Sequence, residues 1–167
     1  KEKLHEEGIF TIDKGLALHQ DIRPLRILIL NLMPLKKPTE LQLLRLLGDS
    51  PLQVEVDFCH TDSHESTHTD PSYLEENYYV FDEIKDNYYD GFIITGAPVE
   101  QIPFESVDYW PEMKTYFEWA KTHAFSTLHF CWGAQAALYY YYGIEKRLLP
   151  AKLLGIFEYQ LTQKHHP

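Results

Sequence analysis

The chain alternates between short apolar runs and longer segments in which apolar residues recur every three or four positions. Four runs are rich in β-branched and aromatic residues, and they lie at 25–33, 53–59, 90–95 and 126–130. Short runs of this kind are typical of buried β-strands. The first is apolar almost throughout, which suits a central parallel strand covered on both faces. A further strand is expected at 155–161.

Helices are predicted between the strands from their periodicity and their end signals. Thr39 would cap the first helix, with Gln42 completing a capping box and Gly48 ending the helix. Two further helices are expected over 71–81 and 111–121. The second of these is amphipathic. Its inward positions are Met113, Phe117 and Ala120.

The alternation of strands with helices favours a doubly wound α/β fold with a mostly parallel sheet. Residues 1–22 are mixed and polar and are expected to form an N-terminal arm, while 23–167 would form a single α/β catalytic domain. Residues 99–109 are predicted to be a surface loop. Ligands in such sheets bind beyond the carboxyl ends of the strands. The loops expected there are 34–38, 96–101 and the turn at Cys131.

The segment 126–138 carries the clearest candidate chemistry. An apolar run leads to Cys131, and good helix formers follow at once, so no loop separates the strand from the helix. This is the arrangement of a nucleophile elbow, in which small neighbours, here Gly133 and Ala134, let the chain reverse sharply. The N-terminus of the helix would face the sulfur. Its partial positive charge favours a thiolate, and its free N–H groups can hold an oxyanion.

Two interpretations of Cys131 stay open on the sequence alone. It is either a nucleophile or a buried structural thiol, because free cysteine is among the most buried residue types. A cysteine nucleophile normally has a histidine in reach. His129 lies two residues earlier on the same strand, on the same face but deeper, so it is interpreted as a packing or supporting residue.

The backbone N–H groups of Trp132 and Ala97 are the candidate donors to an oxyanion. Trp132 would open the helix behind the cysteine, and Ala97 lies in the loop that ends the third predicted strand. For the segment 96–98, an ordinary strand-ending turn is an equal alternative.

Composition narrows the classes of function. Of the 167 residues, 44% are hydrophobic and 24% charged, which is the range of globular proteins. The net charge of −10 and the pI near 5.3, without a basic stripe, argue against a nucleic-acid partner. Cys59 and Cys131 give no sign of a disulfide framework, which favours a reducing cytoplasm. No membrane span or signal peptide is visible, so no membrane association is expected.

Two further features of the sequence bear on function. His60, His64 and His68 are spaced by four residues, as metal ligands on a helix would be. The intervening residues include Ser, Thr and Asp, which disfavour helix interiors, so a solvated loop is preferred and no metal is expected. The tyrosine run 139–142 would expose aromatic surface on all sides of a helix, and it predicts a homodimer.

Four motifs occur together along the chain. They are RPL at 23–25 running on to NLMP at 31–34, TGAPVE at 95–100, DYW at 108–110 and CWGAQA at 131–136. In this order, and over essentially the whole chain, they resemble the homoserine O-acyltransferases of the homoserine transsuccinylase type. The resemblance implies a fold like the class I glutamine amidotransferases, with flavodoxin-like layering. It also implies a ping-pong reaction, in which acyl-CoA acylates a cysteine and an amino-acid hydroxyl then takes the acyl group.

The resemblance also implies roles for individual residues. Cys131 falls on the acyl-thioester nucleophile, and Glu100 on the position that selects the acyl group. Lys152 falls on a substrate-binding lysine, and Lys36 on a lysine near the active site. The family's catalytic histidine and glutamate fall after Pro167, so the domain is expected to be incomplete at its C-terminus.

The leading hypothesis is a cytoplasmic homoserine O-acetyltransferase of methionine and cysteine biosynthesis, with acetyl-CoA as co-substrate and no other cofactor. A carboxylate at Glu100 would repel the carboxylate of a succinyl group, and in the family a glutamate here goes with acetyl transfer. Homoserine O-succinyltransferase and serine O-acetyltransferase are alternatives on the same scaffold, since one methylene is worth only about 1–3 kcal/mol of discrimination. A glutaminase-type amidotransferase and a non-catalytic binding module are more distant alternatives.

Overall fold

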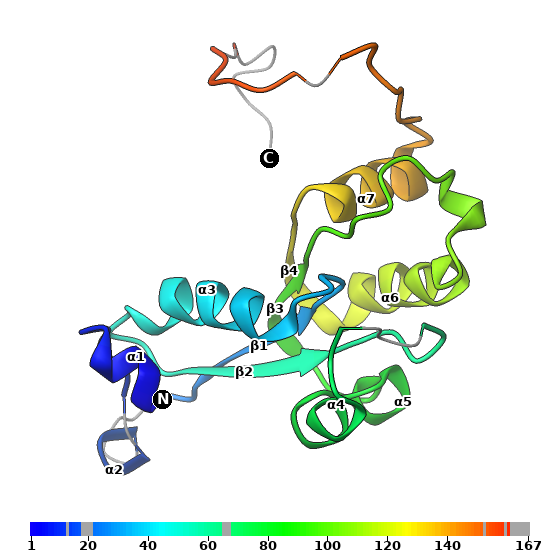
Figure 1. Cartoon of the computed structure of the whole chain (residues 1–167). Coiled ribbons are helices and arrows are strands. Elements are labelled where there is room, and N and C mark those ends of the chain that lie inside the picture. Colours follow the sequence, from blue (N-terminus) through cyan, green and yellow to red (C-terminus); the bar gives the residue numbers. More distant parts are fainter. Residues whose placement is uncertain (13, 18–21, 65–67, 152, 159, 161–167) are drawn as a thin grey trace.

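Four β-strands form a single parallel sheet (Figure 1). The computed structural model describes residues 1–12, 14–17, 22–64, 68–151, 153–158 and 160. The strands in chain order are β1 (Leu25–Leu30), β2 (Val54–Cys59), β3 (Tyr89–Ile94) and β4 (Ala124–His129). Their order across the sheet is β2-β1-β3-β4. All four lie where the apolar runs predicted strands.

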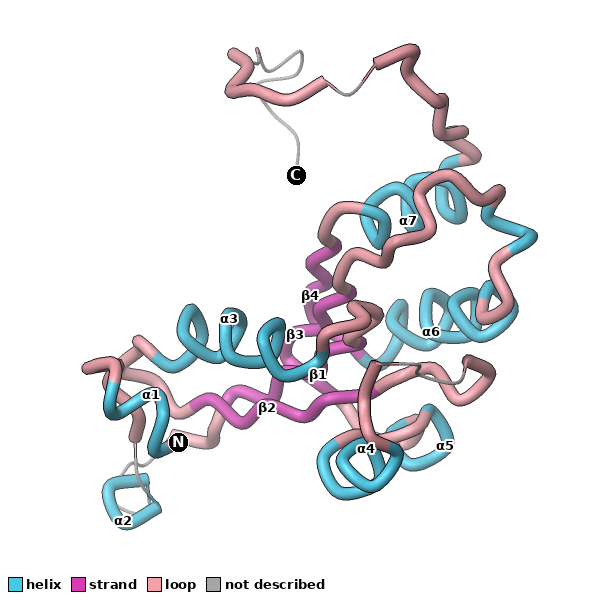
Figure 2. Tube along the Cα trace, viewed as in Figure 1, coloured by secondary structure: helices cyan, strands magenta, loops and turns pink. Residues whose placement is uncertain are grey.

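The helices lie on both sides of this sheet. They are α1 (Glu2–Glu6), α2 (Lys14–Ala17), α3 (Lys36–Gly48), α4 (Pro71–Asn77), α5 (Phe81–Ile84), α6 (Trp110–His123), α7 (Trp132–Tyr142) and the short 3-10 helix η1 (Phe104–Ser106). In Figure 2, α3 lies on one side of the sheet and α4 and α5 on the other. None of the described helices is long and apolar enough to cross a bilayer.

The strand order confirms the predicted doubly wound α/β fold. The chain adds β2 on one side of β1, and then adds β3 and β4 on the other side. The direction of winding therefore reverses between β1 and β3. In open α/β sheets, ligands bind at such a reversal, beyond the carboxyl ends of the two strands. The topology thus directs attention to the loops that follow β1 and β3.

An aromatic core packs between the sheet and α6. Met113, Phe117 and Ala120 are buried, as the amphipathic pattern predicted. Tyr116 stacks on Phe92 of β3, with ring centroids 5.9 Å apart. Burial of aromatic rings of this size contributes a large share of the hydrophobic stabilisation of a small domain.

The prediction of a surface loop over 99–109 is wrong for its second half. Phe104, Val107 and Tyr109 are buried, and η1 lies within the segment. Phe104 stacks on Tyr139 of α7, with ring centroids 4.6 Å apart. The segment lacks helical or strand periodicity, but its apolar side chains complete the core between α6 and α7.

The helix expected from Thr39 begins earlier, at Lys36, so the predicted capping box does not form. Thr39 lies inside the first turn, and its hydroxyl donates to the carbonyl of Leu35 at 3.0 Å. Pro38 is accommodated because the first turn of a helix has no partner for its N–H groups. The helix predicted over 71–81 is also interrupted, because Tyr78 adopts an extended conformation between α4 and α5.

The strand before Cys131 was expected to be buried, and this is wrong for the described chain. β4 lies at the edge of the sheet, and Phe125 and Leu128 are 81% and 52% exposed. The further strand expected at 155–161 is not formed over 153–158 or at residue 160, and residues 159 and 161 lie outside the described part. Residues 153–158 lie apart from the sheet in Figure 1, and a strand requires a neighbour for its backbone hydrogen bonds.

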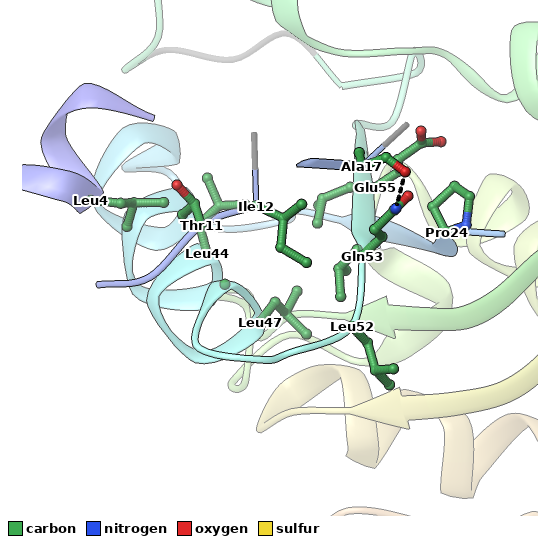
Figure 3. A pocket seen from close by; sticks show the side chains of 13 residues that line it. Leu4, Thr11, Ile12, Ala17, Pro24, Leu44, Leu47, Leu52, Gln53 and Glu55 are labelled. Atoms are coloured by element: carbon green, nitrogen blue, oxygen red, sulfur yellow. Dashed lines mark hydrogen bonds between the residues drawn. The ribbon is translucent and has the colours of Figure 1, made fainter. Parts of the chain in front are cut away.

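The N-terminal arm packs on α3. Leu4 of α1 is buried, and Glu7 forms an ion pair with Arg45 of α3. Between the arm, α3 and the start of β2 lies a cavity of about 290 Å³ (Figure 3). Its lining is mostly apolar, and the side chain of Gln53 crosses it to donate to the carbonyl of Ala17 at 2.7 Å. Its described lining residues include no cysteine, histidine or lysine, and it lies at the amino ends of the strands, so we assign it to the packing of the arm.

The tyrosine run of α7 is largely used within the chain. Tyr139, Tyr140 and Tyr141 are half-buried, and their hydroxyls bond to Glu105, Glu118 and the carbonyl of Phe117. Tyr142 is 74% exposed. The homodimer stays a prediction. Of the four tyrosines on which it rests, Tyr142 is the one whose side chain is exposed.

Candidate active site

Cys131 lies in a strained turn between β4 and α7. Its φ of 50° and ψ of −118° make it the one non-glycine residue with positive φ in the described part of the chain. Such a conformation costs about 1–3 kcal/mol and persists only where the surrounding structure holds it. The predicted strand, turn and helix are therefore present. Cys131 is exposed, so it is not a buried structural thiol.

Two glycines leave the space in which this turn fits. A β-carbon on Gly133 would stand 2.5 Å from the carbonyl oxygen of Thr95, so only glycine brings the first turn of α7 this close to the end of β3 without a shift. A β-carbon on Gly96 would stand 3.0 Å from the β-carbon of Cys131 and 3.4 Å from its sulfur. The loop after β3 is therefore in direct contact with the cysteine.

The carboxyl ends of three strands are fastened together around the turn. The N–H of Phe130 donates to the carbonyl of Ile94 at 2.9 Å, and the N–H of Thr95 donates to the carbonyl of Leu30 at 3.1 Å. The N–H of Leu32 donates to the hydroxyl of Thr95 at 2.8 Å. These bonds join the loops that follow β1, β3 and β4.

The N–H groups of Trp132 and Ala97 are available as donors. The first turn of α7 is closed by the N–H groups of Ala134 and Gln135, which both donate to the carbonyl of Cys131 at 3.1 Å. Within the described residues, neither Trp132 N–H nor Ala97 N–H donates a hydrogen bond. Trp132 directly follows the cysteine, and Ala97 follows the glycine that contacts it. Free N–H groups in such positions can hold an oxyanion, and their role stays a prediction.

His129 packs under the turn. Its ring lies 6.0 Å from that of Phe117, and its Nδ1 is buried without a partner among the described residues. Burial lowers the pKa of His129, because an imidazolium would lose its hydration there. No hydrogen bond joins it to Cys131 within the described chain. The geometry agrees with a packing residue and does not make His129 a base.

Lys36 is buried at the start of α3. It is 8% exposed, and its ammonium donates to the carbonyl of Asn31 at 2.5 Å. Desolvation lowers the pKa of Lys36 to about 8. The Asn31 side chain donates to the hydroxyl of Tyr78 at 2.9 Å, and that hydroxyl donates to Glu40 at 2.6 Å. A buried polar network therefore holds Lys36 at the end of β1.

Lys36 lines a cavity of about 680 Å³ beyond the carboxyl ends of β1 and β3. Loops after both strands contribute to it, and so do three histidines. These are His60, His64 and His68. They lie in a loop, as predicted, and His64 Nδ1 lies 2.6 Å from a carboxylate oxygen of Asp108. The sequence pattern alone does not predict this pair, although Asp108 belongs to the DYW motif.

Glu100 lies on a second cavity, of about 950 Å³, between its loop, the side of α7 and the segment that follows α7. Glu100 itself is exposed. The loop after β3 therefore borders both cavities, since Pro98 and Val99 line the first and Glu100 the second. Lys152 lies outside the described residues. The structure thus joins Cys131, Trp132 and Ala97 in one place, and it places Lys36 and Glu100 in separate cavities.

Comparison with known families identifies the family of this chain. The sequence model described as homoserine O-succinyltransferase matches residues 1–167. The chain belongs to this family. Membership agrees with the four motifs, which include the exposed Cys131 at the carboxyl edge of the parallel sheet.

Individual members of the homoserine O-succinyltransferase family are similar over the same length. The homoserine O-acetyltransferases of Agathobacter rectalis and Lachnoclostridium phytofermentans are each 56% identical over 167 residues, and that of Lachnospira eligens is 53% identical. All of this chain is covered, but only 54%, 56% and 54% of the respective relatives. The chain thus spans about half the length of the curated relatives it matches.

Proposed function

We propose that the protein to which this chain belongs transfers an acyl group from acyl-CoA to the hydroxyl of homoserine. The observation that carries the proposal is the exposed Cys131 in its strained turn, at the N-terminus of α7. Family membership supports the choice of homoserine, because every relative named above is a homoserine O-acetyltransferase. Methionine biosynthesis follows as the role proposed for the product, and the cytoplasm as the proposed location.

The first half-reaction would acylate the cysteine. The Cys131 thiolate attacks the thioester carbonyl carbon of acyl-CoA, and the N–H groups of Trp132 and Ala97 hold the oxyanion of the tetrahedral intermediate. The bond to the CoA sulfur then breaks, and CoA leaves as a thiol after taking a proton. In the second half-reaction the homoserine hydroxyl attacks the new thioester and loses its proton. O-acylhomoserine is released and the Cys131 thiol is restored.

The remaining groups follow from the resemblance. A base for the homoserine hydroxyl is expected from the catalytic histidine and glutamate that the family carries after the segment matching this chain. Lys36 and Lys152 are the proposed substrate-binding lysines. The buried ammonium of Lys36 faces a cavity at the reversal point of the sheet, which is where a small polar substrate would be held.

We propose acetyl-CoA as the donor, with Glu100 rejecting the succinyl group. Two carboxylates about 4 Å apart repel by ~1 kcal/mol in water and by ~4 kcal/mol at an effective dielectric of ~20. Glu100 is exposed, so the lower part of this range applies. That is roughly five- to fiftyfold discrimination, at ~1.4 kcal/mol per factor of ten. The family is described by succinyl transfer and the relatives named above by acetyl transfer, so the side chain at this position is the feature to test.

Intact-mass spectrometry of the full-length protein tests the proposal. Mixing it with acetyl-CoA in the absence of homoserine should add one acetyl group, and Cys131→Ser should remove that adduct while Cys59→Ser keeps it. Adding homoserine should discharge the thioester and form O-acetylhomoserine. Discharge by serine instead would change the proposed acceptor. If no adduct forms, or if ammonia is released from glutamine instead, the acyltransferase assignment is wrong.

The donor is tested by single-turnover acylation with acetyl-CoA and succinyl-CoA. Glu100→Gly should raise the rate with succinyl-CoA relative to acetyl-CoA. A wild-type preference for succinyl-CoA would refute the selector role of Glu100, and so would an unchanged ratio in the glycine variant.

A further inference from the structure

The ammonium of Lys146 donates hydrogen bonds to the backbone of the loop that carries Glu100. Its ammonium donates to the carbonyl oxygens of Glu100 at 2.8 Å, of Val99 at 3.5 Å and of Ile102. A lysine ammonium has three N–H donors, and these three carbonyls use them all. No ion pair of Lys146 with a carboxylate is found among the described residues, although Glu145 is its neighbour in the chain.

The end of α7 brings Lys146 to this place. Gly143 takes a left-handed conformation with φ of 66°, and its N–H donates to the carbonyl of Tyr139 at 2.8 Å. The N–H of Ile144 then donates to Leu138 at 3.3 Å. This pattern ends a helix and turns the chain back along it. Lys146 therefore reaches the loop after β3 from the opposite end of the helix that begins behind Cys131.

The ammonium of Lys146 also packs on an aromatic ring. Lys146 Nζ lies 4.6 Å from the centroid of the Phe104 ring, within the range of a cation–π interaction. Phe104 is 3% exposed and stacks on Tyr139. Desolvation lowers the pKa of Lys146, which agrees with an ammonium partly withdrawn from water. The loop thus runs from Gly96, which lies beside Cys131, to Phe104, whose buried ring the ammonium of Lys146 contacts.

We infer that Lys146 is a positioning residue for acyl-donor selection, which holds the loop 99–102 so that the Glu100 carboxylate stays beside the acyl group. The inference rests on the proposed role of Glu100. Without the ammonium, three carbonyls lose their common partner and the loop can populate other conformations. Glu100 would then stand beside the acyl group in only a fraction of molecules, and discrimination would fall with that fraction.

The experiment measures the ratio of single-turnover acylation rates with acetyl-CoA and succinyl-CoA in the full-length protein. Lys146→Met keeps the aliphatic length and removes every donor. It should lower the acetyl-to-succinyl ratio severalfold, toward the ratio of Glu100→Gly and by no more than the roughly five- to fiftyfold discrimination attributed to Glu100, because molecules with a displaced loop no longer reject the succinyl group. Lys146→Arg keeps donors and charge and should retain most of the ratio. Thermal unfolding of each variant shows whether the fold is kept. If Lys146→Met does not fold, Lys146→Gln should lower the ratio by a smaller factor.

Two controls separate positioning from charge. Arg147→Met removes an adjacent cation that lines the same cavity as Glu100 but makes no hydrogen bond within the described chain, so it should change the ratio much less than Lys146→Met does. In a Glu100→Gly background, Lys146→Met should have no further effect on the ratio, because the group it positions is gone. A further fall in that background would overturn the inference.

The outcomes distinguish this inference from the proposed function. If no variant and no donor acylates Cys131, the proposed function itself fails. If acylation occurs but Lys146→Met leaves the ratio unchanged, the inference is wrong, whatever Glu100→Gly does. A rise in the acetyl-to-succinyl ratio would also overturn it, since that result would show the ammonium acting by its charge on the succinyl carboxylate.

Discussion

Gly96 lies against Cys131 so closely that a β-carbon at position 96 would stand 3.0 Å from the cysteine β-carbon and 3.4 Å from its sulfur. Contacts of this length force one partner to move by a few tenths of an ångström. Both groups belong to the candidate site, because the next residue after Gly96 offers a free N–H and Cys131 offers the thiol. The close approach of the loop after β3 to the Cys131 side chain therefore depends on the absence of a side chain at position 96.

Gly96→Ala should slow the acylation of Cys131 by roughly tenfold or more, since displacement of a reacting group by 1 Å can cost about a hundredfold. Stability should change much less, because the contact is with an exposed side chain. Gly48→Ala is the matched control, since its β-carbon would meet only ordinary contacts of 3.5–3.7 Å far from the sulfur. Single-turnover mass spectrometry measures both. Equal rates in the two variants would show that the contact does not position the thiol.

The two cysteines should differ sharply in their reaction with a thiol reagent. Cys131 is exposed, whereas Cys59 is 0% exposed and its Sγ donates to the carbonyl of Ile29 at 3.6 Å. Burial also raises the pKa of the Cys59 thiol, which disfavours the reactive thiolate. Native protein should therefore label one thiol quickly and the second only in denaturant. Cys131→Ser should abolish the fast phase, and a fast phase that survives this change would contradict the structure.

Lys36 should make stability depend on pH in a defined window. Burial disfavours its ammonium, so its pKa in the folded protein is about 8 against 10.5 for the free group. Between these two pKa values, Lys36 binds a proton in the unfolded chain but not in the folded one, so the free energy of unfolding rises with pH. Below pH about 8 the lysine is protonated in both states, and it adds no pH dependence. Relative to Lys36→Met, the rise should amount to at most about 3 to 4 kcal/mol over this window, at ~1.4 kcal/mol for each pH unit.

Urea denaturation of both proteins between pH 7 and 10.5 measures this difference, in which the other titrating groups cancel. Titration of the Lys36 ε-carbon signal by NMR gives the pKa independently. A midpoint near that of a free lysine, with parallel stability curves, would show that the ammonium is hydrated and not buried.

Tyr78→Phe should destabilise the protein by about 1–3 kcal/mol, because it removes a buried hydroxyl on which two partners depend. That hydroxyl donates to Glu40 and accepts from the Asn31 side chain. Tyr73→Phe is the control, since it removes a single bond to the same carboxylate from a half-buried ring. Its cost should be smaller. Equal costs by urea denaturation would show that the Asn31 bond contributes nothing to stability.

Much of the fold could be predicted because local pattern encodes backbone geometry. Apolar runs placed β1 to β4 within a few residues, and the period of α6 identified its buried face, including Met113 and Phe117. The turn at Cys131 was predictable as well. A strand that passes directly into a helix, with small residues behind the cysteine, leaves few other conformations.

Burial and long-range contacts were decided by the tertiary structure. β4 has the composition of a buried strand, but it lies at an edge of the sheet and its side chains are largely exposed. Its composition could not predict this, because exposure depends on which segments pack beside the strand. Lys36 and Lys146 are residues that ordinarily face water. The first is buried because the chain turns back over the end of β1, and the second is bound to a loop 44 to 47 residues earlier in the chain. Side-chain type and periodicity do not predict such partners, because the interacting groups are far apart in the sequence and meet only in the folded chain.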